Sequence, residues 1–92
     1  MNAHQKIVFS HNPTTRPVSA DARAEALSDP GFGKVFTDHM VTIRWTLDRG
    51  WHDAQIRARE AIALDPAAAV LHYGQEIFEG LKAYNLSDGT IA

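Results

Sequence analysis

Two histidines of this sequence each stand beside an aspartate, and these pairs are the most obvious candidates for chemistry. Asp38 precedes His39, and His52 precedes Asp53. Imidazole with carboxylate is the usual combination both for proton transfer and for metal binding. Neighbouring residues of a strand point to opposite faces, however, so adjacency alone does not build a site. Because no further histidine lies at ligand spacing, solvated or locally hydrogen-bonded imidazoles are the favoured interpretation.

Other familiar catalytic patterns are incomplete. Gly31-Phe32-Gly33 lacks the third glycine and the strand-to-helix setting of a phosphate-binding loop, so a turn is favoured. No Gly-x-Ser-x-Gly elbow occurs. Lys82 raises the question of a Schiff-base lysine, but such a lysine must be desolvated, and nothing in the local sequence indicates this. A solvated or ion-paired Lys82 is expected.

A set of large aromatic residues must either fill a core or line a pocket, and spacing alone favours a core. The set consists of Phe32, Phe36, Trp45, Trp51, Tyr73, Phe78 and Tyr84.

The elements that position these residues begin with a polar lead-in and a short helix. Ile7-Val8-Phe9 is an apolar island before Asn12-Pro13, which favours an extended or turning backbone. Ser19 or Asp21 is expected to cap a short helix, which residues 29–31 end with proline and glycine. Residues 1–31 are therefore predicted to be a flexible lead-in to a domain over residues 32–92.

A mixed α and β pattern follows. Residues 40–45 predict a strand, and Asp48-Arg49-Gly50 predicts a turn. Residues 51–57 and 61–64 are expected to be short strands, although residues 57–60 suit a helix equally well. Asp65-Pro66 predicts the start of a helical turn.

The last part of the chain combines a helical pattern with a hairpin pattern. Apolar residues from Tyr73 to Leu81 recur at helical spacing, and Gly80 is placed where a helix can close. Residues 82–84 predict a strand that enters an Asp88-Gly89 turn, with residues 90–92 as a short returning strand. The fold class expected from the whole pattern is α+β, a mixed sheet with short helices.

Composition narrows the function classes. A chain of 92 residues with 45% hydrophobic residues suffices for one small domain. The interspersed charges sum to -2, which disfavours nucleic-acid binding, and the lack of cysteine excludes disulfides and thiolate sites. No apolar run approaches the length of a membrane span, so a cytoplasmic protein is expected. An organelle transit peptide is a minor alternative: no acidic residue precedes Asp21, but Pro13 and Pro17 disfavour the amphipathic helix that such a peptide forms.

Several blocks of the sequence together resemble one enzyme family. Residues 32–40 (FGKVFTDHM), Gly50-Trp51, residues 64–67 (LDPA) and residues 71–84 (LHYGQEIFEGLKAY) are similar to the opening of branched-chain amino acid aminotransferases of the pyridoxal phosphate fold-type IV group. The resemblance implies the small N-terminal domain of that fold, present in part. It also implies transfer of an amino group between leucine, isoleucine or valine and 2-oxoglutarate, with pyridoxal 5'-phosphate as cofactor and a homodimer as the assembly.

The resemblance assigns a substrate pocket but no catalytic residue. The positions of Phe32, Tyr73 and Phe78 match those that line the pocket for the branched side chain in the family. Such a pocket is expected to accept all three substrates, because a methylene discriminates by only ~1–3 kcal/mol. The cofactor lysine and the phosphate-binding residues belong to family segments after Ala92, and none of Lys6, Lys34 and Lys82 matches that lysine. The isolated chain is therefore expected to be an inactive and weakly folded fragment.

One departure from the family pattern and two alternative functions remain. Where the family usually has a proline-aromatic pair, this sequence has residues 57–61 (RAREA), which puts the local strand in doubt. Other fold-type IV enzymes, D-amino acid aminotransferase and aminodeoxychorismate lyase, share Phe78-Glu79-Gly80. The other alternative is a non-catalytic, truncated interaction module that pairs with itself or with a full-length subunit.

Overall fold

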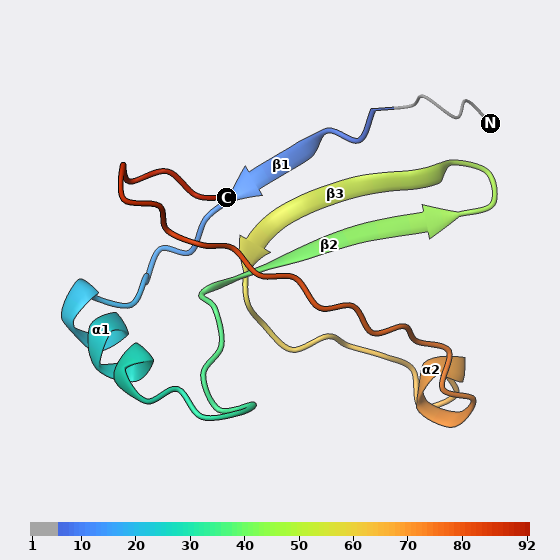
Figure 1. Cartoon of the computed structure of the whole chain (residues 1–92). Coiled ribbons are helices and arrows are strands. Elements are labelled where there is room, and N and C mark those ends of the chain that lie inside the picture. Colours follow the sequence, from blue (N-terminus) through green and yellow to red (C-terminus); the bar gives the residue numbers. More distant parts are fainter. Residues whose placement is uncertain (1–5) are drawn as a thin grey trace. The chain divides into compact units, whose positions relative to one another are not determined.

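The computed structural model describes residues 6–92, and residues 1–5 of the expected lead-in lie outside it. The chain forms two compact units, one up to Ala61 and one over Ile62–Ala92, and each is described by itself. The elements are β1 (Phe9–Asn12), α1 (Ala20–Ser28), β2 (His39–Thr46), β3 (Gly50–Ala58) and α2 (Ala69–His72) (Figure 1). Strands with short helices confirm the expected α+β class.

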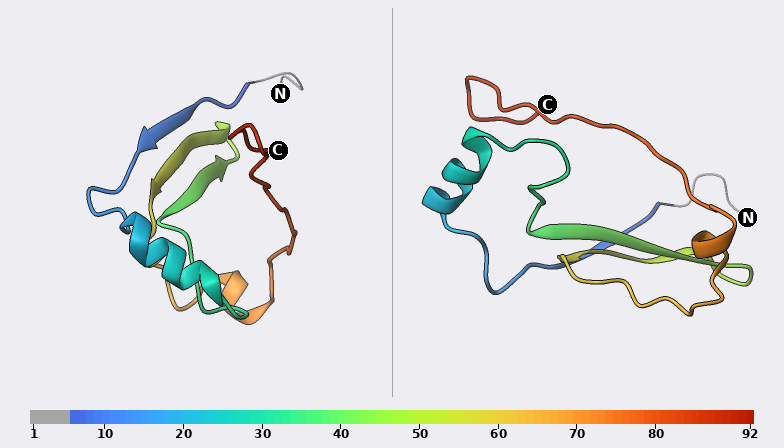
Figure 2. Two further views of the ribbon diagram at one scale, coloured as in Figure 1. Left: turned by 60° about the vertical axis from the view of Figure 1, so that its left-hand side comes forward. Right: turned by 90° about the horizontal axis from the view of Figure 1, so that it is seen from below.

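The first unit is built on a mixed three-stranded sheet with the order β1-β3-β2. β1 runs parallel to the central strand β3, and β2 runs antiparallel to it. Figure 2 shows the twisted β2-β3 ribbon and, beyond one end of it, helix α1. The twist is the right-handed one that L-residues impose on paired strands.

Strand β1 is the part of this sheet that the sequence did not predict. Residues 9–12 were expected in a flexible lead-in, but Phe9 pairs with Ala54 and Asn12 with Arg57. A parallel pairing joins segments far apart in the chain, so no local turn residue announces it. The lead-in thus contains one strand and one helix, while the predicted boundary between residues 31 and 32 stays a prediction.

Strands β2 and β3 form the hairpin that alternation and turn residues predicted. His39 pairs with Ala58 at one end, and Thr46 pairs with Gly50 at the turn. Gly50 has a φ of +65°, a left-handed conformation that glycine adopts without steric cost. β3 continues through Ala58, so the helical alternative for residues 57–60 is wrong. The strand expected over residues 61–64 does not form either.

A β-bulge interrupts this hairpin beside Asp53. The register shifts between Thr42 and Arg44, where β3 supplies one residue more than β2. Asp53 has a φ of +52°, and it is the only non-glycine residue with positive φ among residues 6–92. Aspartate tolerates this conformation better than most residues, because its short side chain makes local hydrogen bonds.

The sheet has one apolar face and one more polar face. Alternation places Phe9, Val41, Ala54 and Ile56 on the same side of their strands, since paired residues share a face. Ala54, in the central strand, is 3% exposed and is the only buried hydrophobic residue described. The core of this unit is therefore a single small side chain under its neighbours.

Helix α1 begins and ends where the sequence predicted. Of the two expected caps, Ser19 is the one used: the Ala22 N–H donates to its Oγ at 3.1 Å. Asp29 is the C-cap, immediately before Pro30-Gly31. No residue of this helix is buried, so capping at its ends defines it more than packing does.

The second unit has little regular structure. Asp65 starts a turn by accepting the Ala67 N–H on Oδ1 at 2.7 Å, and α2 follows at Ala69. The helix expected between Tyr73 and Gly80 is absent. Ile77 and Phe78 are more than nine-tenths exposed, so the apolar stripe meets no partner within its own unit. Without such a partner, a short helix does not offset the cost of ordering its backbone.

The end of the chain forms the small hairpin that its turn residues predicted. Tyr84 and Ala92 exchange two backbone hydrogen bonds of 2.7 and 3.0 Å, and Asn85 bridges Ile91. Asp88 accepts from both the N–H and the hydroxyl of Thr90. Among residues 6–92, no helix is long and apolar enough to cross a membrane.

Candidate functional site

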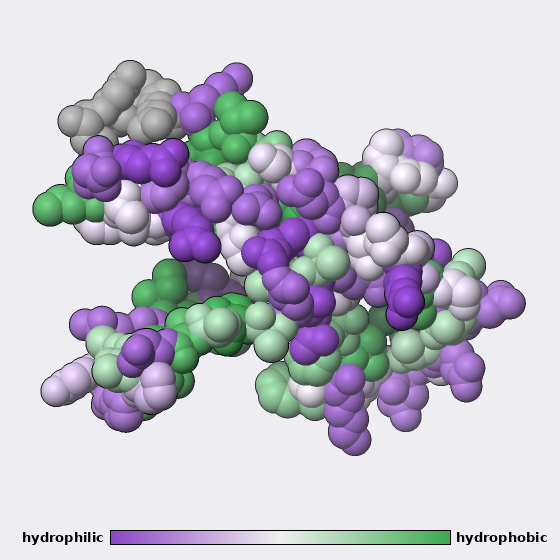
Figure 3. Space-filling model, turned by 180° about the vertical axis from the view of Figure 1, so that it is seen from behind, coloured by the Kyte–Doolittle hydropathy of each residue, from purple (hydrophilic) through white to green (hydrophobic). Residues whose placement is uncertain are grey.

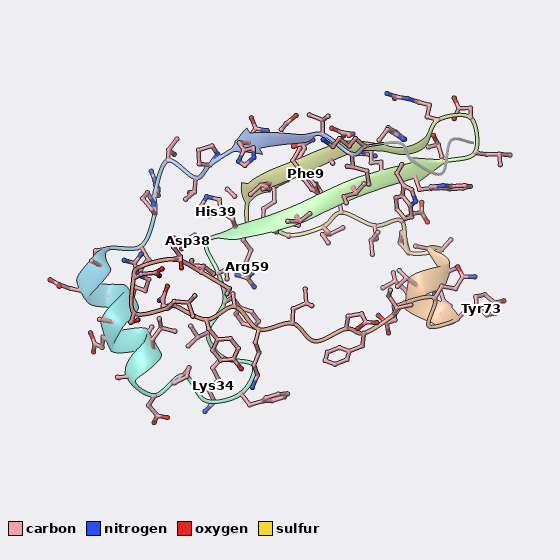
Figure 4. The ribbon with its side chains drawn as sticks, turned by 45° about the horizontal axis from the view of Figure 1, so that its top comes forward. Phe9, Lys34, Asp38, His39, Arg59 and Tyr73 are labelled. Atoms are coloured by element: carbon pink, nitrogen blue, oxygen red, sulfur yellow. The ribbon has the colours of Figure 1, made fainter. Side chains whose placement is uncertain are left out.

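The first histidine-aspartate pair lies where β2 begins and where β3 leads out of the sheet (Figure 4). The Thr14 N–H donates to His39 Nε2 at 3.0 Å, and the Val18 N–H donates to Asp38 Oδ2 at 3.1 Å. The Arg59 N–H donates to the Asp38 carbonyl at 2.9 Å. Both side chains therefore attach the connection between β1 and α1 to the sheet. Sequence adjacency singled out the pair, but not its partners 20 and 25 residues away.

An open groove of about 440 Å³ lies beside this pair in the first unit. Its lining combines apolar side chains with polar and charged ones, drawn from Val18, from α1 and from the segment that leads into β2: Val18, Arg23, Ala26, Leu27, Val35, Phe36, Thr37, Asp38 and His39. Outside it, the Arg59 guanidinium lies 4.5 Å from the centre of the Phe36 ring. This cation-π contact connects the segment before β2 to the exit of β3.

The second pair, His52 and Asp53, serves the bulge. Gln55 Nε2 donates to Asp53 Oδ1 at 2.8 Å, and Arg44 Nε donates to Oδ2 at 3.2 Å. The bond from Gln55 and the charge and bond of Arg44 hold the pKa of Asp53 below its ordinary value. His52 Nδ1 lies 3.0 Å from the Gly50 carbonyl. Within residues 6–92, no three His, Asp or Glu side chains gather in a way that would bind a metal ion.

The three residues assigned to the substrate pocket lie in different units. Phe32 belongs to the first unit, and Tyr73 and Phe78 belong to the second. They are 98%, 83% and 93% exposed, respectively, so none is packed within its own unit. Phe32 stands between two glycines with positive φ, and Tyr73 is the C-cap of α2. Their convergence on one pocket stays a prediction.

The expectation that the aromatic residues fill a core is wrong for the residues described. Phe36, Trp45, Trp51 and Tyr84 are each more than half exposed. The tryptophans face each other as a cross-strand pair at the turn end of the β2-β3 hairpin. Green hydrophobic surface accordingly appears in many places on the face shown in Figure 3. Rings that no core covers remain available for contacts outside their own unit.

None of the three lysines provides the setting of a cofactor lysine. Lys6, Lys34 and Lys82 are all exposed, whereas a lysine that forms an imine at neutral pH is desolvated. The side chain of Lys34 lies over Gly31, where an added Cβ would meet its Cδ at 3.4 Å. The described residues therefore do not fit a covalent anchor for pyridoxal phosphate.

Comparison with known proteins gives consistent names. No family model matches the sequence. The chain is 59% identical over 80 residues to a probable branched-chain-amino-acid aminotransferase of Streptomyces coelicolor, across 87% of this chain and 22% of the relative. It is 55% identical over 83 residues to a branched-chain-amino-acid aminotransferase of Mycolicibacterium smegmatis, across 90% of this chain and 23% of the relative. A cytosolic branched-chain-amino-acid aminotransferase of Saccharomyces cerevisiae is 50% identical over 60 residues, across 65% of this chain and 16% of the relative. The chain thus spans about a fifth of the length of these curated relatives.

Proposed function

Since the chain belongs to the branched-chain amino acid aminotransferase family, we propose that it supplies part of the substrate pocket of a transaminase. The reaction is transfer of an amino group between leucine, isoleucine or valine and 2-oxoglutarate. The observation that carries this proposal is the identity of more than half of the matched residues over nearly nine-tenths of the chain.

Exposed aromatic residues support the assignment of the pocket. Phe32, Tyr73 and Phe78 contribute little to packing within their own units, because each is more than four-fifths exposed. A hydrocarbon substituent is recognised by removing it from water against such surfaces. Ring faces without charged groups exclude water from the branched side chain, and they distinguish one methylene by only ~1–3 kcal/mol. One pocket then serves all three amino acids.

Transfer of the amino group requires a cofactor and a lysine that anchors it. Pyridoxal 5'-phosphate supplies an electron sink when bound in enzymes of this kind. No lysine among residues 6–92 fits its anchor, and the role proposed for these residues is to bind and orient the substrate. A homodimer and a cytoplasmic location belong to the same proposal, and the yeast relative is named cytosolic.

A chimeric enzyme tests the proposal directly. Residues of this chain replace the matched 83-residue segment of the Mycolicibacterium smegmatis relative, which keeps its remaining sequence. Transamination of leucine, isoleucine, valine and D-alanine with 2-oxoglutarate is then measured. We expect activity on the three branched substrates within about tenfold of one another, because each differs by about a methylene. Leu47→Ala, in an exposed turn residue, is the matched control and should leave these rates unchanged.

Two outcomes would contradict the proposal. One is a chimera that folds and binds pyridoxal phosphate but turns over none of the branched substrates. The other is a preference for D-alanine, which would place the segment with D-amino acid aminotransferases. The isolated chain provides a further check, because borohydride reduction with pyridoxal phosphate should give no stoichiometric adduct on Lys82.

A further inference from the structure

The connection between β1 and α1 is attached to the sheet by two side chains of different chemistry. Thr14 donates its N–H to the imidazole of His39, and Val18 donates its N–H to the carboxylate of Asp38. Thr14 and His39 are both half-buried. The two bonds lie at the two ends of a five-residue stretch, residues 14–18, that includes Pro17. The N-terminal strand is thereby held at its exit as well as along its length.

The bond to His39 requires one protonation state. Nε2 accepts a hydrogen only while it carries a free lone pair, which is the neutral ring protonated on Nδ1. An imidazolium carries hydrogens on both nitrogens, so Nε2 would meet the Thr14 N–H donor to donor. The bond from Val18 lacks this sensitivity, because carboxylates keep their charge over the range in which imidazoles titrate.

Charged and titratable side chains line the two hollows beside His39. His11 of β1 shares a hollow of about 200 Å³ with it, and Arg23 of α1 shares the groove. On β3, its paired residue Ala58 stands between two arginines, whose side chains alternate to the opposite face of the strand. The charged and titratable side chains that line these two hollows together with His39 are His11, Arg23 and Asp38. Arg16 lies on the β1-α1 connection, and Arg57 pairs with Glu60 on the other face of β3. The acceptor for the Thr14 N–H is His39 Nε2.

We propose that the hydrogen bond from the Thr14 N–H to His39 Nε2 is a proton-sensitive clasp. This clasp holds the β1-α1 connection on the sheet. The clasp is closed while the ring is neutral and opens when the ring is protonated. Val18 and His39 both line the groove beside α1, so opening the clasp loosens that wall. The device depends only on residues of the first unit and is independent of the proposed transaminase function.

Amide hydrogen exchange on the full 92-residue chain tests the clasp. Protection of Thr14 and Val18, normalised to intrinsic exchange rates, is measured from pH 8 to pH 5. We expect Thr14 to lose about five- to tenfold of its protection as His39 titrates, equivalent to one ordinary hydrogen bond. Val18 should keep its protection over that range. The ¹⁵N shifts of the His39 ring, recorded in the same samples, identify the tautomer and the titration.

Substitutions separate His39 from its neighbours. His39→Gln places a non-titrating amide oxygen near the position of Nε2, so Thr14 should stay protected down to pH 5. His11→Gln is the matched control, because it removes the other imidazole of the hollow and should leave the wild-type pH response in place.

Three results would overturn the clasp. The first is Thr14 that is unprotected at pH 8 in the wild-type chain. The second is protection of Thr14 that does not change while the His39 ring shifts report protonation. The third is a pH response that disappears in His11→Gln and persists in His39→Gln. The wild-type measurements suffice for a decision if a variant does not fold.

Discussion

The β2-β3 hairpin and the segment over residues 73–83 use apolar residues in opposite ways. In the hairpin, alternation places apolar residues on one face, and Ala54 is buried there in the central strand. In the segment, an equally regular apolar pattern forms no helix, and its side chains remain almost fully exposed. A pattern thus fixes local structure only where the same unit supplies its partner.

This difference separates residues that pack within their own unit from residues that do not. The segment over residues 71–84 carries the longest block of family resemblance, yet after α2 ends at His72 it forms no helix or strand. Large apolar side chains that do not pack within their own unit are expected to make contacts outside it. A substrate pocket is one such contact, and it is the one proposed for Tyr73 and Phe78.

Enlarging the single buried side chain should cause the largest loss of stability. Ala54→Leu forces extra volume beneath Phe9 and Ile56, which we expect to cost ~1–3 kcal/mol. Urea unfolding followed by the fluorescence of Trp45 and Trp51 measures it. Ala63→Leu makes the same change at an exposed position of the second unit and should alter the unfolding free energy by less than about 0.5 kcal/mol. Equal effects of the two substitutions would remove the contrast between the regions.

A matched pair of glycine substitutions sharpens the contrast at the backbone. Gly50→Ala imposes a Cβ on a φ of +65° at the hairpin turn, with an expected cost of ~1–2 kcal/mol. Gly80→Ala adds a Cβ in open space at a φ outside the left-handed region, and no loss is expected. The same urea titration reports both. A loss at Gly80 as large as that at Gly50 would show that the second region has packing that its exposed side chains do not reveal.

Asp53 in the first unit and Asp88 in the second should differ in how their titration affects the stability of the β2-β3 hairpin. Hydrogen bonds lower the pKa of Asp53, mainly that from Gln55, and the pKa of Asp88, mainly that from Thr90. A depressed pKa adds stability above the ordinary carboxyl value, and this is lost as pH falls through the folded value. Carbon NMR titration should find both carboxyls below 3.8.

Substitution shows which of the two carboxyls contributes to the stability of the hairpin. Asp53→Asn should weaken the acid dependence of hairpin unfolding, and Asp88→Asn should leave it unchanged. An unchanged acid dependence in Asp53→Asn would mean that Arg44 and Gln55 do not stabilise the bulge through this carboxylate.

Local signals in the sequence predicted much of the first unit, and long-range pairings account for most of what they missed. Ser19 and Asp29-Pro30 mark the two ends of a helix, and Gly50 marks a turn. These signals act within a few residues of the chain, so α1 and the β2-β3 turn were predictable. The pairing of β1 with β3 and the bond from Thr14 to His39 span more than twenty residues. No local residue type encodes them.

The candidate pocket was assigned only through resemblance, and that assignment stays a prediction. Spacing assigned the aromatic residues to a core, which the exposure of Phe32, Tyr73 and Phe78 does not support. Periodicity also predicted a helix near Phe78, because the pattern records apolar positions without recording what covers them. The blocks that resemble aminotransferases identified the family, and the sequence comparisons agree with them.

The catalytic efficiency of the chimera with leucine, before and after Phe78→Ala, tests the central claim most directly. If the exposed ring of Phe78 serves the substrate, kcat/KM for leucine should fall at least about tenfold, since truncating a pocket ring removes more than one methylene of contact. The unfolding midpoint of the isolated chain should not change with the same substitution. An unaltered kcat/KM for leucine in a folded chimera would contradict the assignment of Phe78 to the pocket.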